Sequence, residues 1–104
     1  AAPGAHGIVM SHLSHAYPDG ASLYFTLAFP RAPERAVEQW LAVKNAASGA
    51  IVANGGTISH HHGVGIDHLP WIQTEKGAHG IAALKALKRE LDPAGILNPG
   101  KLLP

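Results

Sequence analysis

Three consecutive histidines, His60, His61 and His62, are the residues of this chain best suited to chemistry. An imidazole has a pKa of about 6.5, so it can take up or release a proton near neutral pH, and its neutral form can bind a metal ion. The neighbouring Gly63 and Gly65 permit backbone conformations that an ordinary surface loop rarely needs. The segment therefore predicts a functional loop. The alternative is that the three histidines are ordinary surface residues without a chemical role.

A metal site is a second interpretation of the same residues. In an extended backbone, His60 and His62 would share one face and His61 would lie on the other, because side chains alternate along a strand. Zinc would then need another ligand, and the candidates are His12, His15 and His68. None of them has the spacing of a known metal-binding motif, so this interpretation is the weaker one.

Tyr17 is a further candidate, because a phenol can both donate and accept a hydrogen bond. It would matter for chemistry if it met the histidine loop. Single histidines on strands are more often structural, and we interpret His12 and His15 in that way.

The elements that position these residues begin with a predicted hairpin. Residues 7–14 read as one strand, and residues 21–29 as its antiparallel partner, in which large apolar side chains alternate with smaller or polar ones. The apolar set is Leu23, Phe25, Leu27 and Phe29. We expect a connection longer than a minimal turn, with Tyr17 near its tip.

Helical segments follow the hairpin. A helix is expected from about Pro33 to Ala53, ended by residues 54–56, with its apolar side packed toward the sheet. That side comprises Val37, Trp40, Leu41, Ala47 and Ile51. Residues 57–58 are expected to form a short strand that runs into the histidine loop. Pro70 can open another helical stretch, which ends at Asp92 before a proline. The fold class is α+β: an antiparallel sheet with a covering helix, plus a C-terminal helical tail.

Composition narrows the classes of function. The chain has 104 residues and a net charge of +1, which provides no basic excess for nucleic acid. It lacks cysteine, which excludes disulfides and thiolate chemistry and is compatible with a reducing compartment. We expect a cytoplasmic location. No apolar run reaches the roughly 18 residues of a membrane span. A start at Ala1 instead of Met suggests a piece of a longer protein.

Three motifs resemble those of FAD-linked oxidases of the vanillyl-alcohol oxidase superfamily. Residues 55–65, Gly-Gly-Thr-Ile-Ser-His-His-His-Gly-Val-Gly, are similar to the triple-histidine loop of the alkyldihydroxyacetonephosphate synthases and their bacterial relatives. Residues 17–25, Tyr-Pro-Asp-Gly-Ala-Ser-Leu-Tyr-Phe, resemble the segment that carries the family's active-site tyrosine. Residues 91–101 resemble the terminal signature of these oxidases. The three motifs occur in the family's order.

The resemblance implies the C-terminal part of a larger flavoenzyme that acts on a small molecule. Residues 1–65 would be the end of its cap, or substrate, domain, and residues 66–104 a helical tail that packs on a flavin domain outside this chain. Tyr17 and the three histidines would line the reaction centre, while Asn98 and Lys101 would approach FAD. The missing domain would bind most of the cofactor, so the isolated piece is expected to be inactive. Part of its apolar surface would be covered by the rest of the longer protein, so the isolated piece is also expected to self-associate.

The segment after the histidine loop, residues 66–71, is less basic than in the synthases, which weakens the inference of an ether-lipid substrate. Two readings from other classes remain open. One is a stand-alone histidine-rich metal-binding module, and the other is an interaction domain without chemistry.

Overall fold

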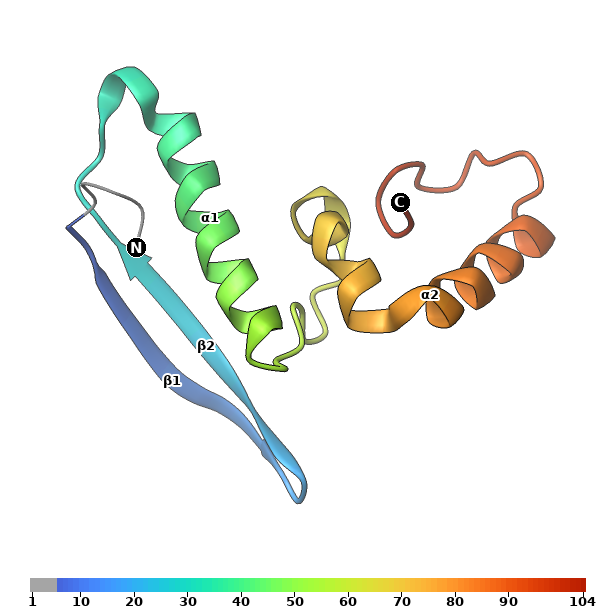
Figure 1. The fold of residues 1–104 in the computed structure, drawn as a ribbon, viewed down its shortest axis with the longest axis horizontal. Coiled ribbons are helices and arrows are strands. Elements are labelled where there is room, and N and C mark those ends of the chain that lie inside the picture. Colours follow the sequence, from blue (N-terminus) through green and yellow to red (C-terminus); the bar gives the residue numbers. More distant parts are fainter. Residues whose placement is uncertain (1–5) are drawn as a thin grey trace. The chain divides into compact units, whose positions relative to one another are not determined.

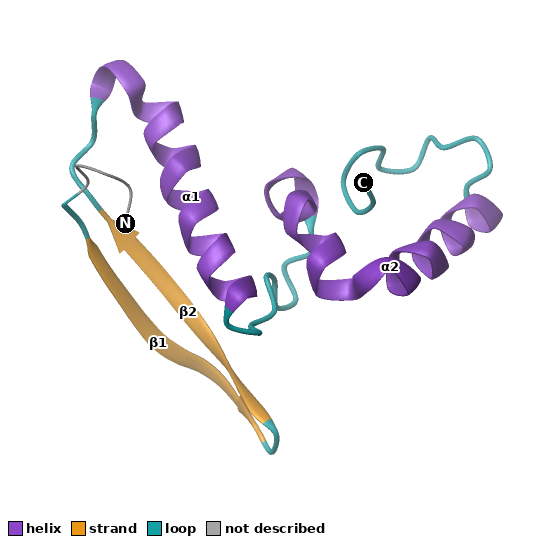
Figure 2. Ribbon diagram, viewed as in Figure 1, coloured by secondary structure: helices purple, strands orange, loops and turns teal. Residues whose placement is uncertain are grey.

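The computed structural model describes residues 6–104 and contains two strands and three helical segments (Figures 1 and 2). They are β1 (Ile8–Tyr17), β2 (Gly20–Ala28), the short 3-10 helix η1 (Pro33–Arg35), α1 (Ala36–Ala53) and α2 (Gly65–Leu91). The chain divides into two compact units, one up to Ala46 and one from Ala47. The predicted α+β class, with an antiparallel sheet, is confirmed.

The hairpin is longer and tighter than expected. Its pairing runs from Ile8 opposite Ala28 to Tyr17 opposite Gly20, with a β-bulge at Ser14. The expectation of a long connection is wrong, because only residues 18–19 form the turn. The bulge accommodates one extra residue in β1, so pairing continues to the tip. Tyr17 therefore ends the strand directly beside the turn.

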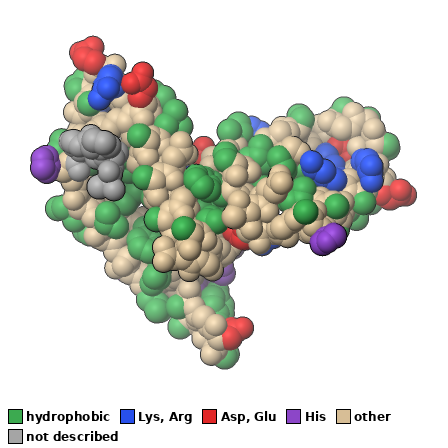
Figure 3. Space-filling view, in the orientation of Figure 1, with side chains coloured by type: hydrophobic (Ala, Val, Ile, Leu, Met, Phe, Trp, Pro, Cys, Tyr) green, Lys and Arg blue, Asp and Glu red, His purple; other side chains and the backbone are tan. Residues whose placement is uncertain are grey.

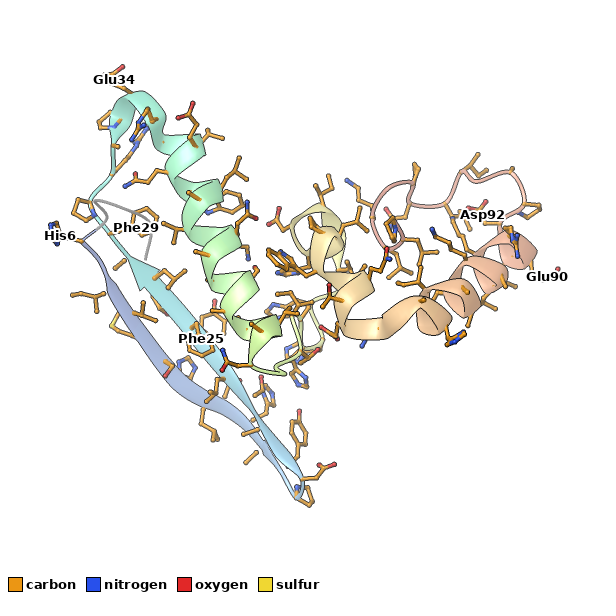
Figure 4. The ribbon with its side chains drawn as sticks, in the orientation of Figure 1. His6, Phe25, Phe29, Glu34, Glu90 and Asp92 are labelled. Atoms are coloured by element: carbon orange, nitrogen blue, oxygen red, sulfur yellow. The ribbon has the colours of Figure 1, made fainter. Side chains whose placement is uncertain are left out.

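The apolar face of β2 is only partly covered. Phe25 and Phe29 lie on the side of β2 along which α1 runs (Figure 4). Phe25 nevertheless remains 46% exposed and Leu23 52% exposed. Gln39 fixes the entry to α1, since its side-chain amide donates to the carbonyl of Pro30 and accepts from the N–H of Ala32, both at 2.9 Å.

Both ends of α1 follow local sequence signals. Pro33 opens η1, which leads directly into α1, as a proline in the first helical turn favours. At the other end, Gly55 has a φ of 75°. The N–H of Gly55 donates to the carbonyl of Val52, and the N–H of Gly56 donates to the carbonyl of Ile51. This pattern satisfies the last carbonyls of the helix and ends it.

The second unit has a small core in which Ile58, Ile72 and Ile81 are buried. Trp71 packs against Gly49 of α1, where a Cβ would lie 3.3 Å from the edge of the indole ring. A glycine inside the helix is thus explained by the close approach of the tryptophan, which compensates for its poor helix propensity.

Two predictions for this unit are wrong. Residues 57–58 do not form a strand. In addition, α2 begins at Gly65, before Pro70, and Gly77 (φ 67°, ψ 170°) divides it into two helical stretches. The predicted end of this helix at Asp92, before a proline, agrees with its last helical residue, Leu91. Within residues 6–104, α1 and α2 are the only long helices, and neither is apolar enough to span a membrane.

Candidate active site

The histidine loop is compact, not extended. The rings of His60 and His61 meet edge to face with centroids 4.5 Å apart, and those of His61 and His62 do so at 4.8 Å. His61 has a φ of 45°, in the left-handed region that non-glycine residues seldom adopt. The extended backbone considered for the metal interpretation is therefore not adopted, and the three imidazoles form one contiguous group.

Ser59 and Gly63 close this loop. The Ser59 hydroxyl donates a hydrogen bond of 2.7 Å to the carbonyl of Gly63, across the three histidines. Gly63 itself has a φ of 79°, and a side chain would be strained in that conformation. The glycines around the histidines thus permit a tight turn, as their pattern indicated.

Glu75 of α2 holds the entry to the loop, a role that the sequence analysis missed. Its carboxylate accepts the N–H of Ile58 at 2.7 Å and the hydroxyl of Thr57 at 2.8 Å. Lys76 also lies 2.8 Å from it. Burial opposes ionisation of Glu75, but the hydrogen bonds from Lys76, Ile58 and Thr57 outweigh it and keep its pKa below the usual value. These bonds take the place of the strand pairing that we expected at residues 57–58.

Tyr17 stacks on His15, with ring centroids 6.3 Å apart and planes inclined by 6°. Ser14, the bulge residue, donates to the carbonyl of Ser22 at 3.2 Å. Its oxygen also lies 3.1 Å from Nδ1 of His15. The Ser14 hydroxyl also lies 3.3 Å from the hydroxyl of Ser22, so this bulge residue joins β2 to His15. The structure thus places the imidazole of His15, which the sequence analysis interpreted as structural, beside the phenol of Tyr17.

The tail after α2 is anchored by Asp92, which is 7% exposed and lies at the helix end (Figure 4). Its carboxylate bonds to Lys88 and accepts the N–H groups of Ile96 (3.1 Å) and Leu97 (3.0 Å). Lys88 also donates to the carbonyl of Leu97 at 2.6 Å. The hydrogen bond from Lys88, with those from Ile96 and Leu97, lowers the pKa of Asp92 despite its burial.

Replacing Asp92 with Asn should flatten the acid response of the protein. A lowered folded-state pKa means that stability is present above the ordinary value of about 3.9 and is lost as the pH falls through the lower folded-state value. Thermal unfolding from about pH 7 to about pH 2 should show a lower melting temperature for Asp92→Asn near neutrality and a smaller fall in acid. The exposed Asp67→Asn in α2 is the control. Parallel curves for wild type and Asp92→Asn would refute the anchoring role.

The predicted site residues divide between the two units. Tyr17 is in the first unit, and the histidine loop, Asn98 and Lys101 are in the second. Asn98 has a φ of 49°, and both tail residues are exposed beyond the segment that Asp92 holds. Among these residues, the three histidines contact one another through their rings.

A metal site is not formed by the described part of the chain. In residues 6–104, no three histidine, aspartate or glutamate side chains gather as ligands for one ion. The candidate residues carry a phenol, imidazoles, an amide and an ammonium group, each of which can donate a hydrogen bond. The chain contains no glycine-rich phosphate-binding motif for the pyrophosphate of a dinucleotide.

Comparison with known proteins shows what the chain is similar to. Residues 1–102 match the family model described as FAD linked oxidases, C-terminal domain. The alkyldihydroxyacetonephosphate synthase of Trypanosoma brucei brucei is 39% identical over 97% of the chain, and that of Caenorhabditis elegans is 44% identical over 88%. The FAD-linked oxidoreductase YgcU of Escherichia coli K12 is 32% identical over 98%.

These relatives are much longer than the chain. It spans 16% of the Trypanosoma synthase, 15% of the Caenorhabditis synthase and 22% of YgcU. No solved structure matches it.

Proposed function

Because this chain belongs to the C-terminal domain family of FAD linked oxidases, we propose that it supplies active-site residues beside the flavin of a larger enzyme. The observation that carries this proposal is the closed histidine loop, within a family match that covers residues 1–102. Residues 1–65 would be the end of the cap domain, and residues 66–104 the tail against the flavin domain. The chain thus belongs to an enzyme family whose cofactor is FAD.

The residues of this chain would act at the ring end of the cofactor. Bound FAD would supply the electron acceptor for the reaction. Tyr17 would transfer a proton to or from the substrate through its phenolic oxygen. His60, His61 and His62 would donate hydrogen bonds to a developing oxyanion or exchange protons with the substrate. Asn98 and Lys101 would hydrogen-bond to the cofactor from the tail.

Two kinds of reaction are candidates for the full-length enzyme: synthesis and oxidation–reduction. The names of the relatives denote a synthase of alkyldihydroxyacetonephosphate and an oxidoreductase. The same phenol and imidazoles suit both, since each requires proton transfer next to a flavin. We therefore propose a small-molecule substrate without choosing between the two, in a cytoplasmic enzyme.

The isolated 104-residue chain should be inactive and should self-associate. Hydrophobic side chains are spread over the visible face (Figure 3). Large ones are among the exposed residues: Ile96 is 74% exposed, Leu91 69% and Ile8 65%. Surfaces of this kind are normally covered by the rest of a protein. Size-exclusion chromatography should show elution that shifts to larger species with concentration. A monomer at every concentration would contradict this expectation.

The visible absorption spectrum of the purified full-length protein tests the proposed function. Bands of oxidised flavin, bleached by a substrate of either reaction class, would support it. A colourless protein that added FAD cannot reconstitute would overturn it.

A further inference from the structure

Glu75 is a half-buried carboxylate of α2 that bonds to the entry of the histidine loop, and it lies outside the three family motifs. Its side chain is 14% exposed. Besides its neighbour Lys76, it contacts Thr57 and Ile58, which are 18 and 17 positions away in the sequence. A contact of this span joins two separate segments of the second unit.

Each oxygen of this carboxylate has a defined partner at the loop. One accepts the hydroxyl of Thr57 and the other accepts the backbone N–H of Ile58, a residue that is itself buried. A buried N–H that loses its acceptor is costly, and hydrogen bonds to an ionised group are stronger than neutral ones. The pair of bonds therefore determines where the backbone enters the loop.

The next residue transmits this constraint to the histidines. Ser59 follows Ile58 directly, and its hydroxyl closes the turn onto Gly63. The entry and the closure together leave little freedom for the segment between them. That segment contains the unfavourable φ of His61 and the two edge-to-face ring contacts. A strained backbone persists only where the surrounding structure enforces it.

We propose that Glu75 is the positioning residue of the triple-histidine loop, holding the imidazoles in their working arrangement through Thr57 and Ile58. This inference rests on the proposed function, because the arrangement matters for turnover only if the loop lines the flavin site. Glu75 itself acts through the loop and takes no part in the chemical step. Misplacement of catalytic groups by about 1 Å can lower a rate about 100-fold.

The test uses the full-length flavoprotein with Glu75→Gln, which keeps the size of the side chain but removes its charge and one of its two acceptor oxygens. Hydrogen exchange followed by mass spectrometry should show residues 57–63 exchanging about 10-fold faster or more. Flavin reduction by the substrate should slow at least about 10-fold, while FAD content and melting temperature stay near those of the wild type. The control is Glu90→Gln, at an exposed position near the end of α2 (Figure 4). It should change neither the hydrogen exchange of residues 57–63 nor the rate of flavin reduction.

Thr57→Val tests the contact between Thr57 and Glu75 by changing the residue on the loop side. It removes one donor and leaves the N–H of Ile58 in place, so its effects should be smaller than those of Glu75→Gln and should not add to them in the double variant. This second variant keeps the test decisive if Glu75→Gln fails to fold.

The outcomes separate the two proposals. Exchange and turnover equal to those of the wild type in Glu75→Gln, with flavin bound, would overturn the positioning role and leave the proposed function standing. A slower reaction that merely follows a fall in melting temperature would also overturn it. If the wild-type protein binds no flavin, the proposed function fails, and the exchange experiment alone still decides whether Glu75 holds the loop.

Discussion

Replacing Tyr17 with Phe should lower turnover of the full-length flavoprotein by about 100-fold to 10,000-fold, the usual contribution of a group that transfers a proton. The substitution removes one oxygen and keeps the ring that stacks on His15. Binding of FAD and folding should therefore be unchanged. The assays are reduction of the bound flavin by candidate small-molecule substrates and formation of alkyldihydroxyacetonephosphate, using whichever reaction the wild type catalyses.

Tyr24→Phe is the matched control for this experiment. Tyr24 lies in the same hairpin, is 52% exposed compared with 46% for Tyr17, and also stacks on a histidine, His12. Loss of its hydroxyl should leave turnover near the wild-type value. Equal rates for Tyr17→Phe and the wild type would remove the phenol from the mechanism, and equal losses in both variants would point to a general effect on the hairpin.

Replacing Ile72 with Ala should have the largest effect on stability. Ile72 is 3% exposed, the most deeply buried apolar residue in the described part of the chain. Truncation of a buried isoleucine removes contacts and leaves a cavity, which costs about 2–5 kcal/mol. A core of so few buried side chains has little to compensate for that loss. The free energy of unfolding from urea titrations, compared at several protein concentrations, measures the effect.

Ile66→Ala makes the same chemical change in the same helix, but at a position that is 64% exposed. Its effect on the 104-residue chain should stay within about 0.5 kcal/mol. If the two variants were destabilised to the same degree, burial of Ile72 would not be the source of the stability of the second unit.

Local signals predicted much of the fold. Alternation of apolar residues indicated β2, Pro33 the start of the first helix, and Gly55 its end, because each acts on backbone geometry within a few residues. The weaker predictions concerned segments whose hydrogen-bond partners lie far along the chain. Residues 57–58 have strand-forming side chains, but their backbone and hydroxyl donors are taken by Glu75.

The sequence by itself determined the family, the α+β class and the identity of the candidate site residues, since these depend on residue types and short spacings. The tertiary structure alone decided how those residues are held. The contact of Glu75 with the loop, the left-handed backbone of His61 and the close packing of Trp71 on Gly49 are all of this kind. Each depends on segments that meet only when the chain has folded, so no local pattern encodes it.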